Sequence, residues 1–152
     1  MKKLAFVLLA FAALPTGCDS HEAKATPTAP KTVQPASTAD DNKALCVQVF
    51  TRARACTDDY IPALVDSRAK YDKPAGLADE VKKDRAAVIA QAKQEWAEDS
   101  KDAAIAQTCD RIAPQMIDDP STVETARGCL AQQACGGFTT CVMPLFEKHV
   151  AK

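Results

Sequence analysis

The chain has 152 residues, enough for one domain of ordinary size. Apolar residues make up 47% and charged residues 26%, as in soluble globular proteins, whereas aromatic residues make up only 5%, a mixture that favours helices. The 19 basic and 20 acidic side chains are interspersed without a basic block, so we expect no nucleic-acid partner.

The N-terminus has the organisation of an export signal. Lys2 and Lys3 precede the apolar run Leu4 to Leu14, LAFVLLAFAAL, which is too short to span a bilayer. We therefore predict that residues 1–17 are a signal peptide and that the rest of the chain is exported.

The stretch LPTGC, which ends at Cys18, resembles the lipobox of bacterial lipoproteins. The resemblance implies a diacylglycerol thioether on Cys18, cleavage after Gly17, and acylation of the new amino group by a fatty acid such as palmitate. It departs from the usual pattern at Pro15, where an aliphatic residue is common. The alternative is ordinary cleavage after Ala25, at the A-x-A match Ala23-Lys24-Ala25, which would give a plain secreted protein. We expect lipid at Cys18 to anchor the chain to a bacterial membrane, facing the periplasm or the cell surface.

Residues 18–41 are rich in Ala, Thr, Pro and Ser and contain almost no large apolar side chain. Such a segment buries too little surface to offset its ordering entropy, so it is predicted to be a disordered linker with an r.m.s. span of roughly 25 to 30 Å. His21 lies in this linker without a partner, which favours a solvated residue over a metal ligand.

Residues 42–152 are predicted to form an all-α domain, a small bundle of five to six short helices. Apolar residues recur at helical spacing, helix-start residues precede the runs, and no strand pattern, repeat or sustained heptad appears. The expected helices cover about 41–56, 58–71, 77–98 and 101–113, with two more beginning near 119 and 138. Ser100 is expected to cap the fourth helix, Pro144 to kink or restart the last, and Trp96 to plug the core.

Seven cysteines are present, and assigning Cys18 to lipid leaves an even number in an exported chain, which predicts three disulfides. The six are Cys46, Cys56, Cys109, Cys129, Cys135 and Cys141. Ten residues on one helix separate Cys46 from Cys56 by roughly 15 Å, so these two cannot pair with each other unless that helix breaks. Similar reasoning separates Cys135 from Cys141 if both are helical. The pairing stays open, although the first helix is expected to connect to the Cys109 region and to the C-terminal hairpin.

No catalytic or cofactor motif is found. The cysteines lack the C-x-x-C spacing of redox enzymes, paired zinc ligands and the C-x-x-C-H haem motif. Two acidic pairs, Asp58 with Asp59 and Asp118 with Asp119, lie where helices are expected to begin, and His149 lies near a helix end. The sequence therefore predicts a protein that is not an enzyme and needs no metal or other cofactor.

A second resemblance covers most of the folded part. The segments ALCVQVFTRARACTDDYIPALVD, EWAEDS and GCLAQQACGGFTTCVMP are similar to a group of small cysteine-containing helical proteins predicted as exported lipoproteins in myxobacteria. The resemblance implies architecture and no particular activity. We expect a non-enzymatic binding or accessory protein of the cell envelope with an envelope protein as partner. The alternative is a carrier that holds a small molecule or a metal in a cavity between helices near Trp96 and the helix-end cysteines, an alternative that free thiols would favour.

Overall fold

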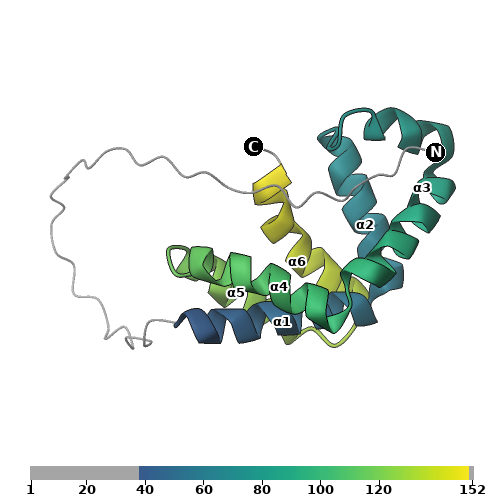
Figure 1. The fold of residues 1–152 in the computed structure, drawn as a ribbon. Helices are drawn as coiled ribbons and strands as arrows, with labels where there is room; N and C mark the ends of the chain where they lie inside the picture. The colour runs from purple at the N-terminus through teal and green to yellow at the C-terminus, as the bar shows by residue number, and fades with distance from the viewer. Residues whose placement is uncertain (1–37, 151–152) are drawn as a thin grey trace, which may run out of the picture. The chain divides into compact units, whose positions relative to one another are not determined.

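The computed structural model describes residues 38–150, with side chains placed up to Lys148, and it confirms the all-α fold of the predicted domain (Figure 1). Six α-helices and one short 3-10 helix follow one another in this part of the chain, and it contains no strand. They are α1 (Ala39–Ala55), α2 (Thr57–Lys70), α3 (Leu77–Asp99), α4 (Asp102–Ile112), η1 (Ala113–Met116), α5 (Pro120–Leu130) and α6 (Cys135–Val150). The predicted signal peptide, and the linker up to residue 37, lie outside the described residues.

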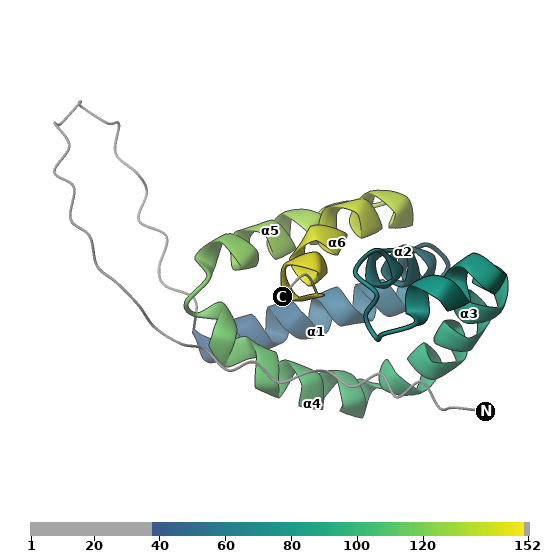
Figure 2. The same ribbon diagram turned by 90° about the horizontal axis from the view of Figure 1, so that it is seen from above.

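The first helix is the centre of the fold. Seen from above in Figure 2, α1 lies between α4 on one side and α5 with α6 on the other, and it contacts α4, η1 and α5. The remaining helices, α2 and α3, pack against each other, and α2 also packs on α6. Since α1 contacts elements from both halves of the sequence, its apolar stripe of Leu45, Val49 and Ala53 forms the middle of the core.

Helix α1 begins at Ala39, two residues earlier than predicted, because a capping box closes its N-terminus. The backbone N–H of Asp41 donates to the Thr38 hydroxyl at 3.1 Å, and the Thr38 N–H donates to the Asp41 carboxylate at 3.2 Å. These two bonds satisfy backbone donors that a helix start otherwise leaves open.

The loop between α2 and α3 is ordered by one carboxylate. Asp72, itself in a left-handed conformation with φ 48°, accepts hydrogen bonds from the backbone N–H groups of Gly76 at 2.9 Å and Ala78 at 3.0 Å. Gly76 has φ 90°, a conformation that residues with a side chain rarely adopt, and it carries no capping side chain of its own. Asp72 therefore caps α3 from outside the helix.

Helix α3 differs from the continuous helix that the sequence predicted. Asp84 has extended backbone dihedrals, φ −157° and ψ 82°, and its side chain accepts from the Ala87 N–H at 3.0 Å, as an N-cap does. Two helical segments therefore meet at Asp84. Along the whole of α3, only Leu77 and Ala92 are fully buried, because this helix lies at the edge of the bundle and packs mainly against α2.

One further expectation about a helix end is wrong, and a second is wrong in part. Ser100 does not cap α4; it is the buried residue that closes α3, and its backbone carbonyl accepts from Arg54 Nη1 at 2.7 Å. Pro144 does not restart the last helix, since α6 continues through it, and the alternative, a kink at Pro144, stays a prediction. The missing N–H of Pro144 deprives the carbonyl of Thr140 of a partner, and Thr140 is exposed, so water can replace that bond.

Ion pairs connect the helices at the surface of the bundle. Arg54 of α1 pairs with Asp102 of α4 at 2.8 Å. Arg85 of α3 donates two hydrogen bonds, of 2.8 and 2.7 Å, to the carboxylate of Asp66 in α2. Exposed pairs of this kind contribute little stability individually but they favour one arrangement of neighbouring helices. None of the helices among residues 38–150 has the length and apolar character needed to cross a membrane.

Candidate functional site

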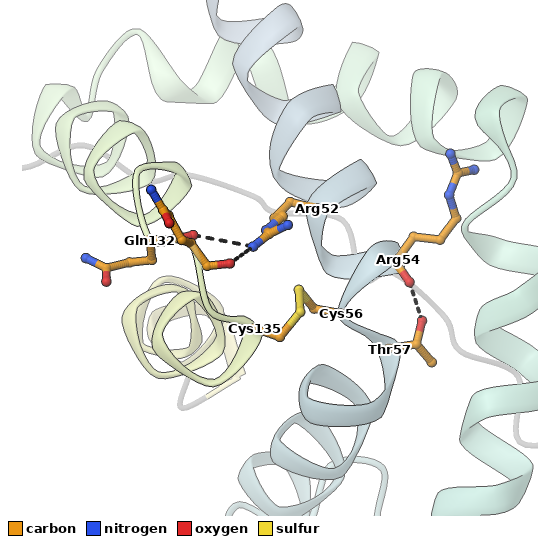
Figure 3. The surroundings of a disulfide bond; sticks show 7 residues. Arg52, Arg54, Cys56, Thr57, Gln132 and Cys135 are labelled. Carbon is orange, nitrogen blue, oxygen red and sulfur yellow. Dashed lines mark hydrogen bonds between the residues drawn. A yellow bond between two sulfur atoms is a disulfide. The ribbon is translucent and has the colours of Figure 1, made fainter.

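Three disulfides hold the helices together. Cys46 pairs with Cys109, which joins α1 to α4; Cys129 pairs with Cys141, which joins α5 to α6. Cys56, at the junction of α1 and α2, pairs with Cys135 at the start of α6 (Figure 3). The Cα atoms of the three pairs are 5.6, 5.4 and 5.2 Å apart in that order, within the range that a disulfide requires.

This pairing agrees with the geometric expectation from the sequence. Cys46 and Cys56 bond to different elements, one to the Cys109 region and the other to the C-terminal pair of helices. Cys135 and Cys141 likewise have separate partners. All six cysteines downstream of Cys18 are therefore oxidised, and none of them offers a thiolate to a metal.

The surroundings of the Cys56–Cys135 bridge include an arginine that the sequence did not single out. Arg52 lies one helical turn before Cys56 and donates through Nη2 to the backbone carbonyls of Gln132, at 3.5 Å, and Gln133 (Figure 3). These carbonyls belong to the loop that leads into Cys135. Arg52 thus fixes the segment in which one half of the disulfide sits.

Trp96 lies in a cluster of four aromatic side chains contributed by α1, α2, α3 and α6. Its ring centroid is 5.4 Å from that of Tyr60 and 6.3 Å from that of Phe50, and Phe146 packs edge-on to both Tyr60 and Phe50. Trp96 therefore packs within this cluster, but it is half-buried and does not plug the core as the sequence predicted.

Tyr60 is 1% exposed, and burial raises the pKa of its phenol well above the usual range, so the phenol stays neutral. Arg68 interacts electrostatically with Tyr60 and Glu95, and burial lowers the pKa of its guanidinium.

Two of the candidate carboxylates, those of Asp119 and Asp58, cap a helix and form an ion pair, respectively. Asp119 is the N-cap of α5: hydrogen bonds from Ser121 and Thr122 lower the pKa of its carboxyl to about 2. Asp58, in the first turn of α2, pairs with Lys93 at 2.6 Å, and that bond lowers the pKa of Asp58. Asp59, which follows Asp58, and Asp118, which precedes Asp119, are both exposed. Asp58 and Asp119 therefore each have a hydrogen-bonding partner that favours the ionised carboxylate.

A shallow hollow of about 350 Å³ lies between α2 and α6. Ser67 at its floor donates to a carboxylate oxygen of Glu147 at 3.0 Å, and the remaining lining residues are Ala63, Asp66, Lys70 and Met143. This lining contains no histidine or cysteine and is separate from the Trp96 cluster, where the sequence placed a possible carrier cavity.

Three residues singled out in the sequence have no described side chain. Cys18, the expected lipid attachment point, and His21 precede residue 38, and the side chain of His149 is not described. Within the described part of the chain, no three histidine, cysteine or acidic side chains gather in a way that would hold a metal ion.

In comparisons with known proteins, no family model, no curated protein and no solved structure matches the chain.

Proposed function

We propose that this protein is a membrane-anchored bacterial lipoprotein whose helical domain acts by binding, as an accessory protein of the cell envelope, and not as an enzyme. The observation that carries the proposal is the LPTGC stretch directly after an apolar run of export-signal length. Lipid on Cys18 would hold the domain at a membrane, because two or more acyl chains give stable anchoring where one alone is marginal.

The disulfide pattern supports this use of Cys18. The six remaining cysteines are all paired among themselves, so the folded domain offers Cys18 no intramolecular partner. Disulfides also persist in the oxidising compartments that exported proteins reach. An odd seventh cysteine next to a signal-like run is most simply used for a lipid thioether.

A binding role fits the surface of the domain better than catalysis does. Polar side chains of the domain cap helices or form ion pairs between helices. Asp119 caps α5, and Arg54 pairs with Asp102. The carrier alternative would need an accessible ligand-binding group, and the thiols that it invoked are oxidised. The expected partner is therefore another envelope protein, reached by a domain on a tether of about 20 residues.

The test compares two single variants of the full chain expressed in a bacterium with a lipoprotein pathway. Cys18→Ser should abolish incorporation of labelled palmitate and release the protein from the membrane fraction. Ala25→Leu, which removes the alternative A-x-A site, should leave both unchanged. Intact mass of the wild type should correspond to Cys18–Lys152 plus acyl chains; a lipid-free chain beginning at Thr26 would overturn the proposal in favour of plain secretion.

A further inference from the structure

The three disulfides differ in how their sulfur atoms lie relative to helix ends. Cys46 and Cys109 are 5% and 0% exposed, and Cys109 lies towards the C-terminal end of α4. Cys129 is 0% exposed and lies in the last turn of α5, while its partner Cys141 is partly exposed, like Cys135, but lies in the interior of α6 and not at a helix start. The C-terminal end of a helix carries partial negative charge, so it disfavours a thiolate at Cys109 or Cys129.

Cys135 is in a different position. It is the first residue of the 16-residue helix α6, where the free backbone N–H groups and the helix dipole favour negative charge. Cys135 is partly exposed, its neighbours Ala134, Gly136 and Gly137 are exposed, and the space beside Gly136 is open. Small residues therefore flank Cys135 in sequence and leave open space beside Gly136 for an incoming thiol, while the Gln132 side chain lies against Gly137.

The positive charge around the bridge attracts an incoming thiolate to Cys135 and favours the release of Cys135 as a thiolate in the second step of reduction. Arg52 holds the carbonyls of Gln132 and Gln133 just before Cys135, and no carboxylate among residues 38–148 forms an ion pair with it (Figure 3). The nearest opposing charges in sequence, Asp58 and Asp59, lie in the first turn of α2 on the Cys56 side, and Asp58 is held by Lys93.

We propose that Cys56–Cys135 is an exchange-competent disulfide that a protein dithiol reduces by attack at Cys135, whereas the other two disulfides are structural. In the first step a thiolate of the reductant bonds to Cys135 Sγ, the Cys56–Cys135 bond breaks, and its electron pair leaves with Cys56 Sγ. In the second step the reductant's other thiolate attacks its own sulfur in the mixed disulfide and releases Cys135 as a thiolate. Two electrons pass to the protein, the reductant becomes a disulfide, and the thiolates take up protons from water.

The consequence of reduction follows from the connectivity. Opening Cys56–Cys135 frees the start of α6 from the junction of α1 and α2. The Cys129–Cys141 bridge still holds α6 on α5, and Cys46–Cys109 still holds α1 on α4. One interhelix connection thus becomes redox-sensitive while the remaining bundle stays cross-linked, and this holds whether or not Cys18 carries lipid.

The proposal is tested on the oxidised full chain, in detergent and without denaturant. Dithiothreitol is added for increasing times, the reaction is stopped with acid, and new thiols are alkylated and located by peptide mass spectrometry. Cys56 and Cys135 should become labelled together, at least about tenfold faster than the other four cysteines. Simultaneous labelling of all six, or earlier labelling of Cys129 and Cys141, would overturn the proposal.

The point of attack and the role of Arg52 need separate measurements. With excess glutathione as the thiol, the trapped mixed disulfide should be found on Cys135; an adduct on Cys56 would contradict the assignment. Arg52→Gln should slow reduction of this bridge by about threefold, as expected for loss of one nearby positive charge. Arg54→Gln is the matched control, since Arg54 is on the same helix but pairs with Asp102; equal rates in the two variants would refute the electrostatic argument.

Discussion

Asn42 is the most unusual buried residue of the bundle, and its replacement by leucine should stabilise the protein. The residue lies one turn before Cys46 on the inner face of α1 and is 0% exposed, yet neither its amide oxygen nor its amide nitrogen has a hydrogen-bond partner. A buried polar group without a partner has lost its bonds to water and gained none in return. Folding therefore proceeds against the desolvation of two such groups.

The expected gain follows from three contributions. Each unpaired group costs about 1 to 3 kcal/mol. Leucine has the same number of heavy side-chain atoms with the same branching at Cγ, but its methyl groups are bulkier, and tight packing costs about 1 to 2 kcal/mol of the gain. Leucine is also the better helix former, by a few tenths of a kcal/mol. Because two groups are unpaired, these contributions sum to a rise in the free energy of unfolding of about 0.5 to 5 kcal/mol for Asn42→Leu, with a corresponding rise in Tm.

The assay is urea denaturation with the disulfides intact, followed by the fluorescence of Trp96, the sole tryptophan. Trp96 packs against Phe50 and Tyr60, so loss of the bundle changes its environment. Gln48→Leu on the exposed face of α1 is the control and should change stability by less than about 0.5 kcal/mol. If Asn42→Leu instead lowers the free energy of unfolding by more than about 1 kcal/mol, the amide is hydrogen-bonded in solution and the reasoning fails.

Three further changes test the packing. Thr139→Val should stabilise the domain by about 1 kcal/mol, because the buried Thr139 hydroxyl lacks a hydrogen-bond partner. Thr108→Val should not stabilise it, because the Thr108 hydroxyl accepts a hydrogen bond from Arg111. Thermal melts of the two variants show whether each Tm rises or falls. Asp119→Ala should cost about 1 kcal/mol by uncapping α5. Since the pKa of Asp119 is about 2 when folded against an ordinary 3.8, its contribution is complete above 3.8 and is lost as the pH falls towards 2, so the wild-type and Asp119→Ala stability curves should converge in acid. Replacing Cys46 and Cys109 by alanine removes a bridge over 63 residues and should lower the free energy of unfolding by about 3 to 4 kcal/mol in urea; an unchanged midpoint would contradict the bridge.

The sequence predicts the helices well wherever their burial pattern is strong. In α1 the residues Leu45, Val49 and Ala53 follow one stripe, and all three are buried in the structure. In α3 the stretch around Lys82 to Ala87 is exposed, so packing does not decide its backbone. There the hydrogen bond from the Ala87 N–H to the Asp84 side chain competes with the helical backbone bonds, and the predicted continuous helix is broken into two segments at Asp84.

Helix caps were predictable only where the capping side chain is next to the helix in sequence. Asp119 directly precedes α5 and caps it as its position indicates. Asp72 caps α3 from the preceding loop, and this cap depends on the left-handed backbone of Asp72 and Gly76. The spacing of apolar residues in the sequence does not predict such a turn. Ser100 has the right chemistry for a cap but is buried instead, with its carbonyl bound to Arg54 from a distant helix.

The cysteines show how far counting alone can reach. Parity and helix length excluded Cys46 with Cys56 and directed the first helix to two separate elements, because a ten-residue helical spacing exceeds the span of a disulfide. The number and spacing of the cysteines do not distinguish one disulfide from another. The disulfides differ in where their cysteines lie relative to helix ends, and α6 begins at Cys135, three residues before its predicted start near Phe138. That shift turns Cys135 from a residue ahead of the helix into its first residue, and the argument for selective reduction depends on that position.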